Sequence, residues 1–188
     1  MAHKSGFVNI IGNPNVGKSS LLNALIGQKL AIINHKAQTT RHRIFGIYNT
    51  DDYQIVFSDT PGVIKPAYKM QENMMTFVHE ALKDADVFLF MAELGDRKFK
   101  DQNILEKLRN TEVPVMVAIN KIDLGDQEDL DEDMEFWSES LPGAKRIFPI
   151  SVKESFNVDS LFGAIKGEIP EGPEWFPKDQ LTDKDERF

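Results

Sequence analysis

The chain has 188 residues, no cysteine and a formal net charge of −8. The absence of cysteine excludes a disulfide framework, a thiolate metal site and a cysteine nucleophile. No apolar run approaches the ~18 residues that a membrane-spanning helix needs, and the length fits one domain plus a remainder, because a domain averages about 150 residues.

Short apolar runs alternate along the chain with helical periodicities. Strands are predicted over residues 7–11, 44–48, 53–57, 87–91, 113–119 and 147–150. Helices are predicted over residues 18–26, 70–82, 101–108, 130–140 and 158–169. A turn sequence joins the second and third strands as an antiparallel hairpin. The pattern therefore predicts an α/β fold, with helices on both faces of a mostly parallel six-stranded sheet that has one antiparallel edge strand.

The sequence changes in character near its end. Three of the nine prolines lie between residues 170 and 177, and the last ten residues are mostly charged. We therefore expect residues 1–169 to form the folded domain and residues 170–188 to be a linker or a docked arm. The aromatic pair Trp175 and Phe176 is expected to pack on the domain or on a neighbour.

The charge is unevenly distributed. Residues 1–50 contain six Lys or Arg residues and no acid, whereas residues 126–139 contain eight acids and no base. The remainder of the chain without the acidic segment is neutral. The acidic segment is expected to be the solvated face of a helix, with Trp137 on its buried side. The acid-free start suits a site that binds phosphate, although chance alone would also explain it.

A phosphate-binding loop is predicted at Gly12–Ser19. The sequence GNPNVGKS matches G-x-x-x-x-G-K-[ST] directly after a strand and at the start of a helix, which is the context that the motif requires. Backbone N–H groups and the helix dipole can hold phosphate oxygens. Lys18 can reach the β- and γ-phosphates, and the Ser19 hydroxyl can ligate Mg²⁺. The predicted phosphate-binding residues are Gly12, Asn13, Pro14, Asn15, Val16, Gly17, Lys18, Ser19 and Ser20. A ligand-free glycine turn is the alternative.

Two further segments can contact the metal and the γ-phosphate. The sequence DTPG at residues 59–62 follows the strand 53–57, where Asp59 can hold Mg²⁺ through water and the glycine N–H can meet a γ-phosphate oxygen. Alone, such a sequence is also an ordinary turn. The adjacent residues Thr39 and Thr40 lie in an aperiodic loop, where a hydroxyl could complete the Mg²⁺ shell. The second group of predicted nucleotide-binding residues is Asp59, Thr60, Pro61, Gly62 and Val63.

A base pocket is predicted at the end of strand 113–119. Asp123, in the sequence NKID, can accept the N1–H and 2-amino hydrogens of guanine, which adenine lacks. Asn120 can bond the other edge of the purine or tie the phosphate loop to this strand, and the Lys121 stem can lie along the base. For an isolated NKID sequence, the alternative is a set of residues that merely starts a helix after a strand. Backbone N–H groups that can reach guanine O6 are predicted at Ser151, Val152 and Lys153.

Taken together, these motifs resemble a known family. GNPNVGKS, QTTR, DTPG, NKID and SVK have the order and spacing of the five motifs of translation-factor-class small GTPases. The stretch GQKLAIINHKAQTTRHRIFGI and the tail IPEGPEWFPKDQLTDKDERF resemble the Era family of bacterial GTPases. The resemblance implies a P-loop NTPase three-layer fold that hydrolyses GTP to GDP with Mg²⁺. It implies catalytic roles for Lys18, Thr40, Asp59 and Gly62, and Mg²⁺ contacts from Ser19, Thr40 and, through water, Asp59.

The resemblance also implies partners and a location. Era-family members act in assembly of the small ribosomal subunit and bind its 16S ribosomal RNA, in the cytoplasm and partly at the inner membrane surface. A monomer is expected. The family's RNA-binding KH domain follows the GTPase domain, and no G-x-x-G loop occurs here after residue 170, so RNA binding is not assigned to these residues.

Val63 stands where Ras-like enzymes have a water-orienting glutamine. GTPases similar to this branch use K⁺ in place of an arginine finger, which makes Asn15 a candidate K⁺ ligand; a turn residue is the alternative. Intrinsic turnover is expected to be slow, on the order of 10⁻⁴ to 10⁻² s⁻¹. Two other functions remain open: a nucleotide-binding regulatory module with negligible hydrolysis, and an ATPase, against which Asp123 argues.

Overall fold

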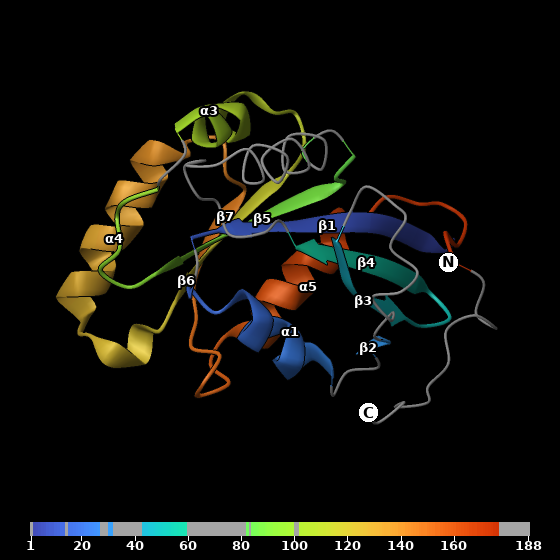
Figure 1. The fold of residues 1–188 in the computed structure, drawn as a ribbon, viewed down its shortest axis with the longest axis horizontal. Coiled ribbons are helices and arrows are strands. Elements are labelled where there is room, and N and C mark those ends of the chain that lie inside the picture. Colours follow the sequence, from blue (N-terminus) through green and yellow to red (C-terminus); the bar gives the residue numbers. More distant parts are fainter. Residues whose placement is uncertain are drawn as a thin grey trace, which may run out of the picture.

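The computed structural model describes residues 2–13, 15–26, 30–31, 43–59, 82, 84–99 and 102–176. Seven strands form one sheet in the order β2-β3-β4-β1-β5-β6-β7 (Figure 1). The strands are β1 (Lys4–Gly12), β2 (Leu30–Ala31), β3 (Arg43–Asn49), β4 (Tyr53–Asp59), β5 (Val87–Glu93), β6 (Val115–Asn120) and β7 (Arg146–Pro149). All pairs from β4 to β7 are parallel, and β3 is antiparallel to β4. The predicted mostly parallel sheet is confirmed. The two-residue strand β2 pairs with β3 on the side away from β4 and adds a seventh strand to the sheet.

Helices lie on both faces of this sheet. They are α1 (Lys18–Ile26), α3 (Gln102–Asn110), α4 (Gln127–Ser140), α5 (Val158–Glu168) and the short 3₁₀ helix η2 (Ile122–Leu124). In Figure 1, α1 and α5 lie on one side of the sheet, and α3 and α4 lie on the other. In the part of the chain that the structure describes, no helix combines the length and the apolar character needed to cross a membrane. The predicted helix 70–82 lies outside the described residues apart from its last position.

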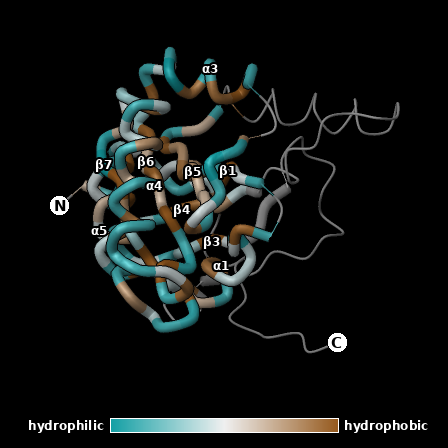
Figure 2. Tube along the Cα trace, turned by 90° about the vertical axis from the view of Figure 1, so that its left-hand side faces the viewer, coloured by the Kyte–Doolittle hydropathy of each residue, from teal (hydrophilic) through white to brown (hydrophobic). Residues whose placement is uncertain are grey.

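The alternation of side chains along the strands divides the apolar core between the two faces. Leu89 of β5 belongs to the cluster beneath α1 and α5, whereas the neighbouring Phe88 and Phe90 belong to the cluster beneath α3 and α4. The Phe90 ring packs 4.9 Å from the Trp137 ring, and both side chains are buried. The prediction that Trp137 lies on the buried side of its helix is confirmed. Figure 2 shows hydrophobic positions on the strands and hydrophilic ones along α4.

Helix α4 begins at Gln127, three residues before its predicted start, because the acidic sequence caps it. The Asp126 carboxylate accepts the Asp129 N–H at 2.9 Å, and the Asp129 carboxylate accepts the Asp126 N–H at 3.1 Å. Such a capping box satisfies two backbone donors, and its negative charge lies at the positive end of the helix dipole. Most acids of α4 are exposed as expected. The prediction is wrong for Asp133, which is fully buried.

Residues 170–176 run along the start of β1. Strand β5 pairs with β1 only from Val8 onward, which leaves the first residues of β1 without a strand on that side. There the Ser5 N–H donates to the Pro170 carbonyl at 3.0 Å, and the Gly172 N–H donates to the His3 carbonyl at 3.0 Å. This part of the predicted linker is therefore a docked arm, hydrogen-bonded along the open side of β1.

One buried side chain of β4, Gln54, holds the end of this arm. Its Oε1 atom accepts the N–H groups of Trp175 and Phe176 at 2.7 and 2.9 Å, and its Nε2 atom donates to the Phe176 carbonyl at 2.8 Å. The Trp175 ring also meets the Phe7 ring edge-on at 5.2 Å, although it stays 60% exposed. The amide of Gln54 thus bonds the arm as a neighbouring strand would.

Replacing Gln54 by alanine is expected to loosen the arm. Because each net hydrogen bond contributes about 0.5–1.5 kcal/mol, the loss of three should lower the free energy of unfolding by about 1.5–4.5 kcal/mol. Urea unfolding measures this, and limited proteolysis should cut the arm faster. The matched control is Gln127→Ala, which removes an exposed bond to Asp131 within one helix and should change stability by less than ~0.5 kcal/mol. Equal losses in both variants would contradict the assignment.

Candidate nucleotide site

The motifs singled out in the sequence lie at the carboxyl ends of neighbouring parallel strands. Strand β1 ends at Gly12, which pairs with Met91 of β5, and Glu93 at the end of β5 pairs with Asn120 at the end of β6. On the other side of β1, Ile10 pairs with Asp59, the last residue of β4. This edge of an open α/β sheet is where such folds bind their ligands.

The loop between β1 and α1 has a backbone that only particular residues adopt. Gly17 has φ +106°, and a Cβ atom there would lie 2.3 Å from Nδ2 of Asn120. Gly12 is also confined, because a Cβ atom would lie 2.5 Å from the Met91 carbonyl oxygen. Asn15 has φ 67°, a left-handed conformation that asparagine tolerates in turns. Both glycines of the predicted motif are therefore required by close packing.

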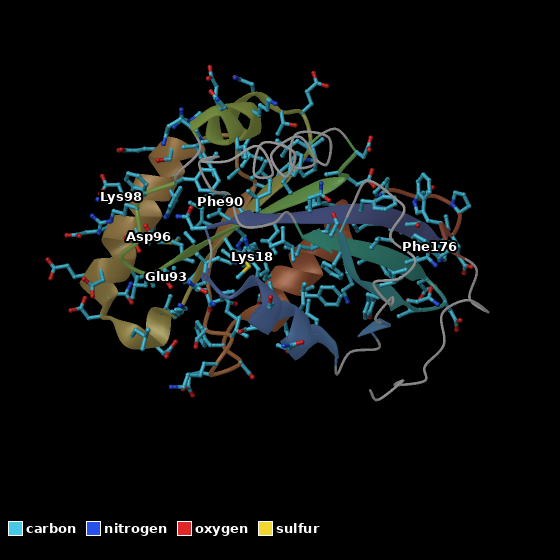
Figure 3. The ribbon with its side chains drawn as sticks, in the orientation of Figure 1. Lys18, Phe90, Glu93, Asp96, Lys98 and Phe176 are labelled. Atoms are coloured by element: carbon cyan, nitrogen blue, oxygen red, sulfur yellow. The ribbon has the colours of Figure 1, made fainter. Side chains whose placement is uncertain are left out.

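Lys18 folds back over this loop. Its side chain is buried, and its ammonium group donates to the Gly12 carbonyl at 2.8 Å (Figure 3). Helix α1 starts at the same residue, with the Leu21 N–H bonded to the Gly17 carbonyl at 2.9 Å. A fixed cation thus lies where the first N–H groups of a helix also point, and the combination attracts an anion. Ser19, in the first helical turn, is exposed.

The Asn120 side chain connects three segments. It is 3% exposed, its Nδ2 atom donates to the Val16 carbonyl at 2.9 Å, and its Oδ1 atom accepts the Val152 N–H at 3.1 Å. Of the two roles that the sequence left open, the structure shows the tie to the phosphate loop. The loop, the NKID sequence and the Ser151–Lys153 segment are consequently held in fixed relation.

The carboxylate of Asp123 is oriented by a buried serine. Ser151, at 1% exposure, donates its hydroxyl to Oδ1 of Asp123 at 2.8 Å and accepts the Glu154 N–H at 3.2 Å. Asp123 itself is exposed. An exposed carboxylate whose orientation is fixed can accept hydrogens from a ligand with little loss of side-chain entropy.

Lys121 extends from NKID back to the phosphate loop. It takes a left-handed backbone conformation with φ 65°, and its ammonium group donates to the Asn15 carbonyl at 2.8 Å. The same group forms an ion pair with Glu93 at the end of β5. The stem of Lys121 therefore spans the gap between two motifs, and its position is fixed at the charged end.

The segment after β5, Leu94–Phe99, also contacts the phosphate loop, and no sequence motif predicts these contacts. The Asn13 side chain donates to the Lys98 carbonyl at 2.5 Å and to the Asp96 carboxylate at 3.3 Å. Asp133 accepts the Gly95 N–H at 2.7 Å. The second residue of the phosphate loop is thus linked to a segment that helix α4 also contacts.

Arg97 completes this set. Its Nε donates to Asp133 at 2.7 Å, and a terminal nitrogen donates to Glu132 at 2.7 Å. These hydrogen bonds, that with Asp133 first, raise the pKa of Arg97 above its ordinary value. A signal for Asp133 was available in the sequence, since it lies one helical turn before Trp137, which was expected to be buried.

The described part of the chain includes only some of the predicted site residues. The main chain of Asp59 is described, at the end of β4. Outside the described residues lie Pro14, Thr39, Thr40, Thr60, Pro61, Gly62 and Val63.

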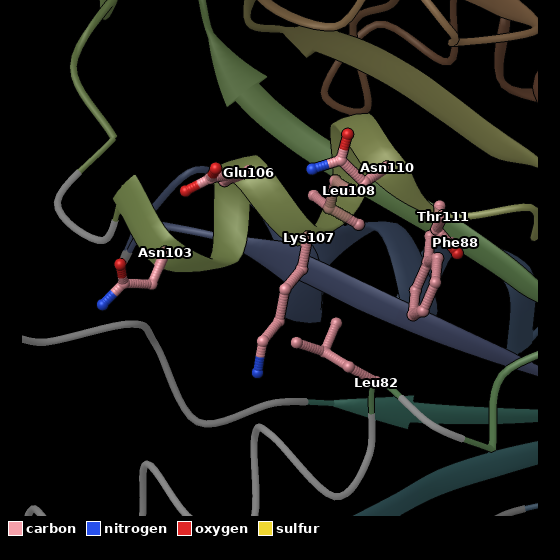
Figure 4. A pocket seen from close by; sticks show the side chains of 8 residues that line it. All are labelled: Leu82, Phe88, Asn103, Glu106, Lys107, Leu108, Asn110 and Thr111. Carbon is pink, nitrogen blue, oxygen red and sulfur yellow. The ribbon is translucent and has the colours of Figure 1, made fainter.

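A cavity of about 630 Å³ lies elsewhere, between α3 and the start of β5 (Figure 4). Its lining includes Leu82, Phe88 and Lys107 and none of the predicted site residues. It therefore adds nothing to the nucleotide site.

The parallel sheet, with a glycine-bounded loop between β1 and α1, defines a P-loop nucleotide-binding fold. A sequence model of the family described as 50S ribosome-binding GTPase matches residues 7–121. The chain belongs to this GTPase family. Over 190 aligned residues it is 46% identical to the GTPase Era of Alkaliphilus metalliredigens, covering all of this chain and 64% of the relative.

Solved structures give the same result. A single-residue variant of Aquifex aeolicus Era bound to GDP.AlF4⁻ has a TM-score of 0.77 and 38% identity, over 96% of this chain and 62% of that one. Era in complex with MgGDPNP and nucleotides 1506–1542 of 16S ribosomal RNA has the same score and identity, over 97% and 62%. The resemblance to Era that the motifs indicate is confirmed, and the chain spans less than two thirds of the length of these relatives.

Replacing Gly17 by alanine tests the packing of the loop. A side chain at φ +106° that also collides with Asn120 should lower the free energy of unfolding by about 1–3 kcal/mol. The control is Gly163→Ala in α5, where a Cβ atom meets nothing within 4 Å and helix propensity should raise stability by up to ~1 kcal/mol. Thermal and urea unfolding measure both. Wild-type stability in Gly17→Ala would rule out the described loop conformation.

Proposed function

We propose that this chain binds GTP with Mg²⁺ and hydrolyses it to GDP and phosphate, as a nucleotide-dependent switch in assembly of the small ribosomal subunit. The observation that carries the proposal is the Asn120 side chain, which joins the phosphate loop to the predicted base pocket. The two Era structures support it, because one holds GDP.AlF4⁻ and the other holds MgGDPNP with a 16S ribosomal RNA fragment.

The phosphate groups would lie in the loop Gly12–Ser20. The Lys18 ammonium group exchanges or shares its bond to the Gly12 carbonyl with β- and γ-phosphate oxygens. The N–H groups at the start of α1 donate to the same oxygens. These donors are held in place by packing before the substrate arrives, so little reorganisation opposes the stabilisation of charge in the transition state.

Mg²⁺ fits the residues at this edge of the sheet. Ser19 offers an exposed hydroxyl in the first turn of α1, and Asp59 ends the strand that pairs directly with β1. We propose that Ser19 and Thr40 ligate the ion and that Asp59 holds it through water. When bound, Mg²⁺ neutralises charge on the β- and γ-phosphate oxygens.

Hydrolysis requires a water molecule to attack the γ-phosphorus while the bond to the β–γ bridging oxygen breaks. Lys18 stabilises charge on the bridging and γ oxygens, and the Gly62 N–H is proposed to hold a γ oxygen. Val63 has no group that orients water, so the attacking water would be positioned by backbone groups, by a second water molecule or by the loop that contains Thr39 and Thr40. Turnover without a partner is therefore expected on the order of 10⁻⁴ to 10⁻² s⁻¹.

Specificity for guanine is assigned to Asp123. Its carboxylate, oriented by Ser151, would accept the guanine N1–H and 2-amino hydrogens. The backbone N–H of Lys153 would donate to O6, because the N–H groups of Ser151 and Val152 already donate to the Phe156 carbonyl and to Oδ1 of Asn120. The Lys121 stem would cover the base. Adenine would leave the carboxylate without its donors, which disfavours an ATPase.

Asp123→Asn should shift preference from guanine to xanthine nucleotides. The amide donates where the carboxylate accepts, so the affinity for GTP should fall at least about 100-fold while that for xanthosine triphosphate rises. Competition against a fluorescent nucleotide measures both. The control is Asp126→Asn, which changes the same charge at the cap of α4. Unchanged GTP affinity in Asp123→Asn would remove the base-pocket assignment.

Potassium dependence is a separate proposal. Asn15 is exposed and has the left-handed backbone conformation of a turn residue. Its backbone carbonyl accepts a hydrogen bond from Lys121, and its exposed side chain is accessible to a cation. We expect GTP hydrolysis to be at least about tenfold faster in K⁺ than in Na⁺ at equal ionic strength, and Asn15→Ala to abolish the difference. Phosphate release measures it. Equal rates in the two salts for the wild type would refute K⁺ as a cofactor.

Residues 1–169 are proposed to be the GTPase domain and residues 170–188 a linker toward an RNA-binding domain. Contacts of residues 170–176 with β1 and Gln54 support the linker as a docked element. The Era complex with 16S RNA favours the small subunit as the site of action. A cytoplasmic location, peripheral contact with the inner membrane and a monomeric state stay predictions from the Era resemblance.

The second candidate is a regulatory module that binds nucleotide without appreciable hydrolysis, which the valine at position 63 favours. Single-turnover release of γ-phosphate with Mg²⁺ and K⁺ separates the two functions. Release within minutes to hours supports the GTPase, and intact GTP after a day supports the module.

A further inference from the structure

We propose that Asp133 is a positioning residue for the phosphate loop and slows the release of bound nucleotide. It acts through the segment Leu94–Phe99, which connects helix α4 to Asn13 by hydrogen bonds. The inference rests on the proposed nucleotide binding, which it deepens by naming residues outside the five sequence motifs.

The first step of the connection is a buried charge. Asp133 is fully buried, and its two oxygens accept the Gly95 N–H and the Arg97 Nε–H, each at 2.7 Å. Burying a carboxylate is costly, and an ion pair with the exposed Arg97 side chain offsets little of that cost. The Asp133 carboxylate instead orients the segment Leu94–Phe99, because its two oxygens accept hydrogen bonds from two residues of that segment.

The second step is the segment itself. Gly95 has φ +86°, the Lys98 N–H donates to the Asp96 carboxylate at 3.1 Å, and the Leu94 N–H donates to the Asn120 carbonyl at 2.9 Å. The segment is therefore tied to β6 at its start and to α4 at its middle. These bonds fix the position of the Lys98 carbonyl, which the segment carries.

The third step is the contact with the phosphate loop. The Nδ2 atom of Asn13 donates to the Lys98 carbonyl at 2.5 Å and to the Asp96 carboxylate at 3.3 Å. The side chain of Asn13 is thus held by the segment, and the main chain of Asn13 can contact phosphate. A loop held on one side by Asn13 and on the other by Asn120 presents its N–H groups in one arrangement. Loss of that pre-organisation is expected to increase the dissociation rate more than it decreases the association rate.

The test compares Asp133→Asn, Asn13→Ala and the double variant. In Asp133→Asn the volume is kept, but an amide NH₂ would face one of two donors, the Gly95 N–H or the Arg97 Nε–H. We expect each single variant to release a fluorescent GDP analogue about three- to tenfold faster. Asp133→Asn loses a charged hydrogen bond, and Asn13→Ala loses the bonds to the Lys98 carbonyl and the Asp96 carboxylate. The double variant should be no faster than the faster single variant, because both changes break one connection.

The matched control is Asp131→Asn. It makes the same change of charge on the same helix, at an exposed carboxylate that, within the described residues, accepts only from Gln127. Release should stay within about twofold of the wild type. A release rate in Asp133→Asn equal to that of Asp131→Asn would overturn the proposal, as would effects that multiply in the double variant.

A second variant and a second measurement guard against misfolding. Arg97 is exposed, so Arg97→Gln should fold normally, and it should also release GDP faster, by about two- to fivefold. Hydrogen exchange at residues 12–17 of the nucleotide-free protein should quicken in both Arg97→Gln and Asp133→Asn. Unchanged release and exchange in Arg97→Gln would overturn the proposal.

The same measurements separate this inference from the proposed function. A wild type that fails to bind the GDP analogue contradicts the proposed function. A wild type that binds it, with variants that release it at the control rate, contradicts the inference alone. Faster release that merely follows a lower unfolding midpoint, with unchanged exchange at residues 12–17, would mark Asp133 as structural and also contradict it.

Discussion

The site depends on a single side-chain amide. Asn120 donates to the phosphate loop through Nδ2 and accepts from Val152 through Oδ1, and it does so in a buried position. Both polar atoms of a buried amide must find partners, so neither contact can be lost cheaply. The close approach also explains Gly17, because any side chain there would occupy the space of the amide nitrogen. Three segments distant in sequence are thereby fixed as one surface.

Much of this could be predicted from the sequence because periodicity and motifs are local signals. The parallel strands, the core residues Phe88 and Phe90 and the strand–loop–helix context all follow from patterns within a dozen residues. The motif also located Lys18 and Asp123 at the correct edge of the sheet, since parallel strands end at one edge.

The rest could not be predicted because it depends on pairings between distant segments. Asn13 meets the Lys98 carbonyl, and Gln54 meets the backbone at Phe176, each across a long stretch of intervening sequence. Neither contact has a pattern in the local sequence. Asp133 was misjudged for a different reason: acidic composition of the whole segment outweighed the helical spacing that links it to Trp137.

Gln54 and Asp59 occupy opposite ends of β4, and Figure 3 shows Phe176 far from Glu93 and Asp96 across the sheet. The arm is therefore anchored at the amino edge while the nucleotide motifs lie at the carboxyl edge. The arm and the nucleotide motifs therefore contact opposite ends of the same strand. In this geometry, the position of the backbone at Trp175 and Phe176 depends on the side-chain conformation of Gln54.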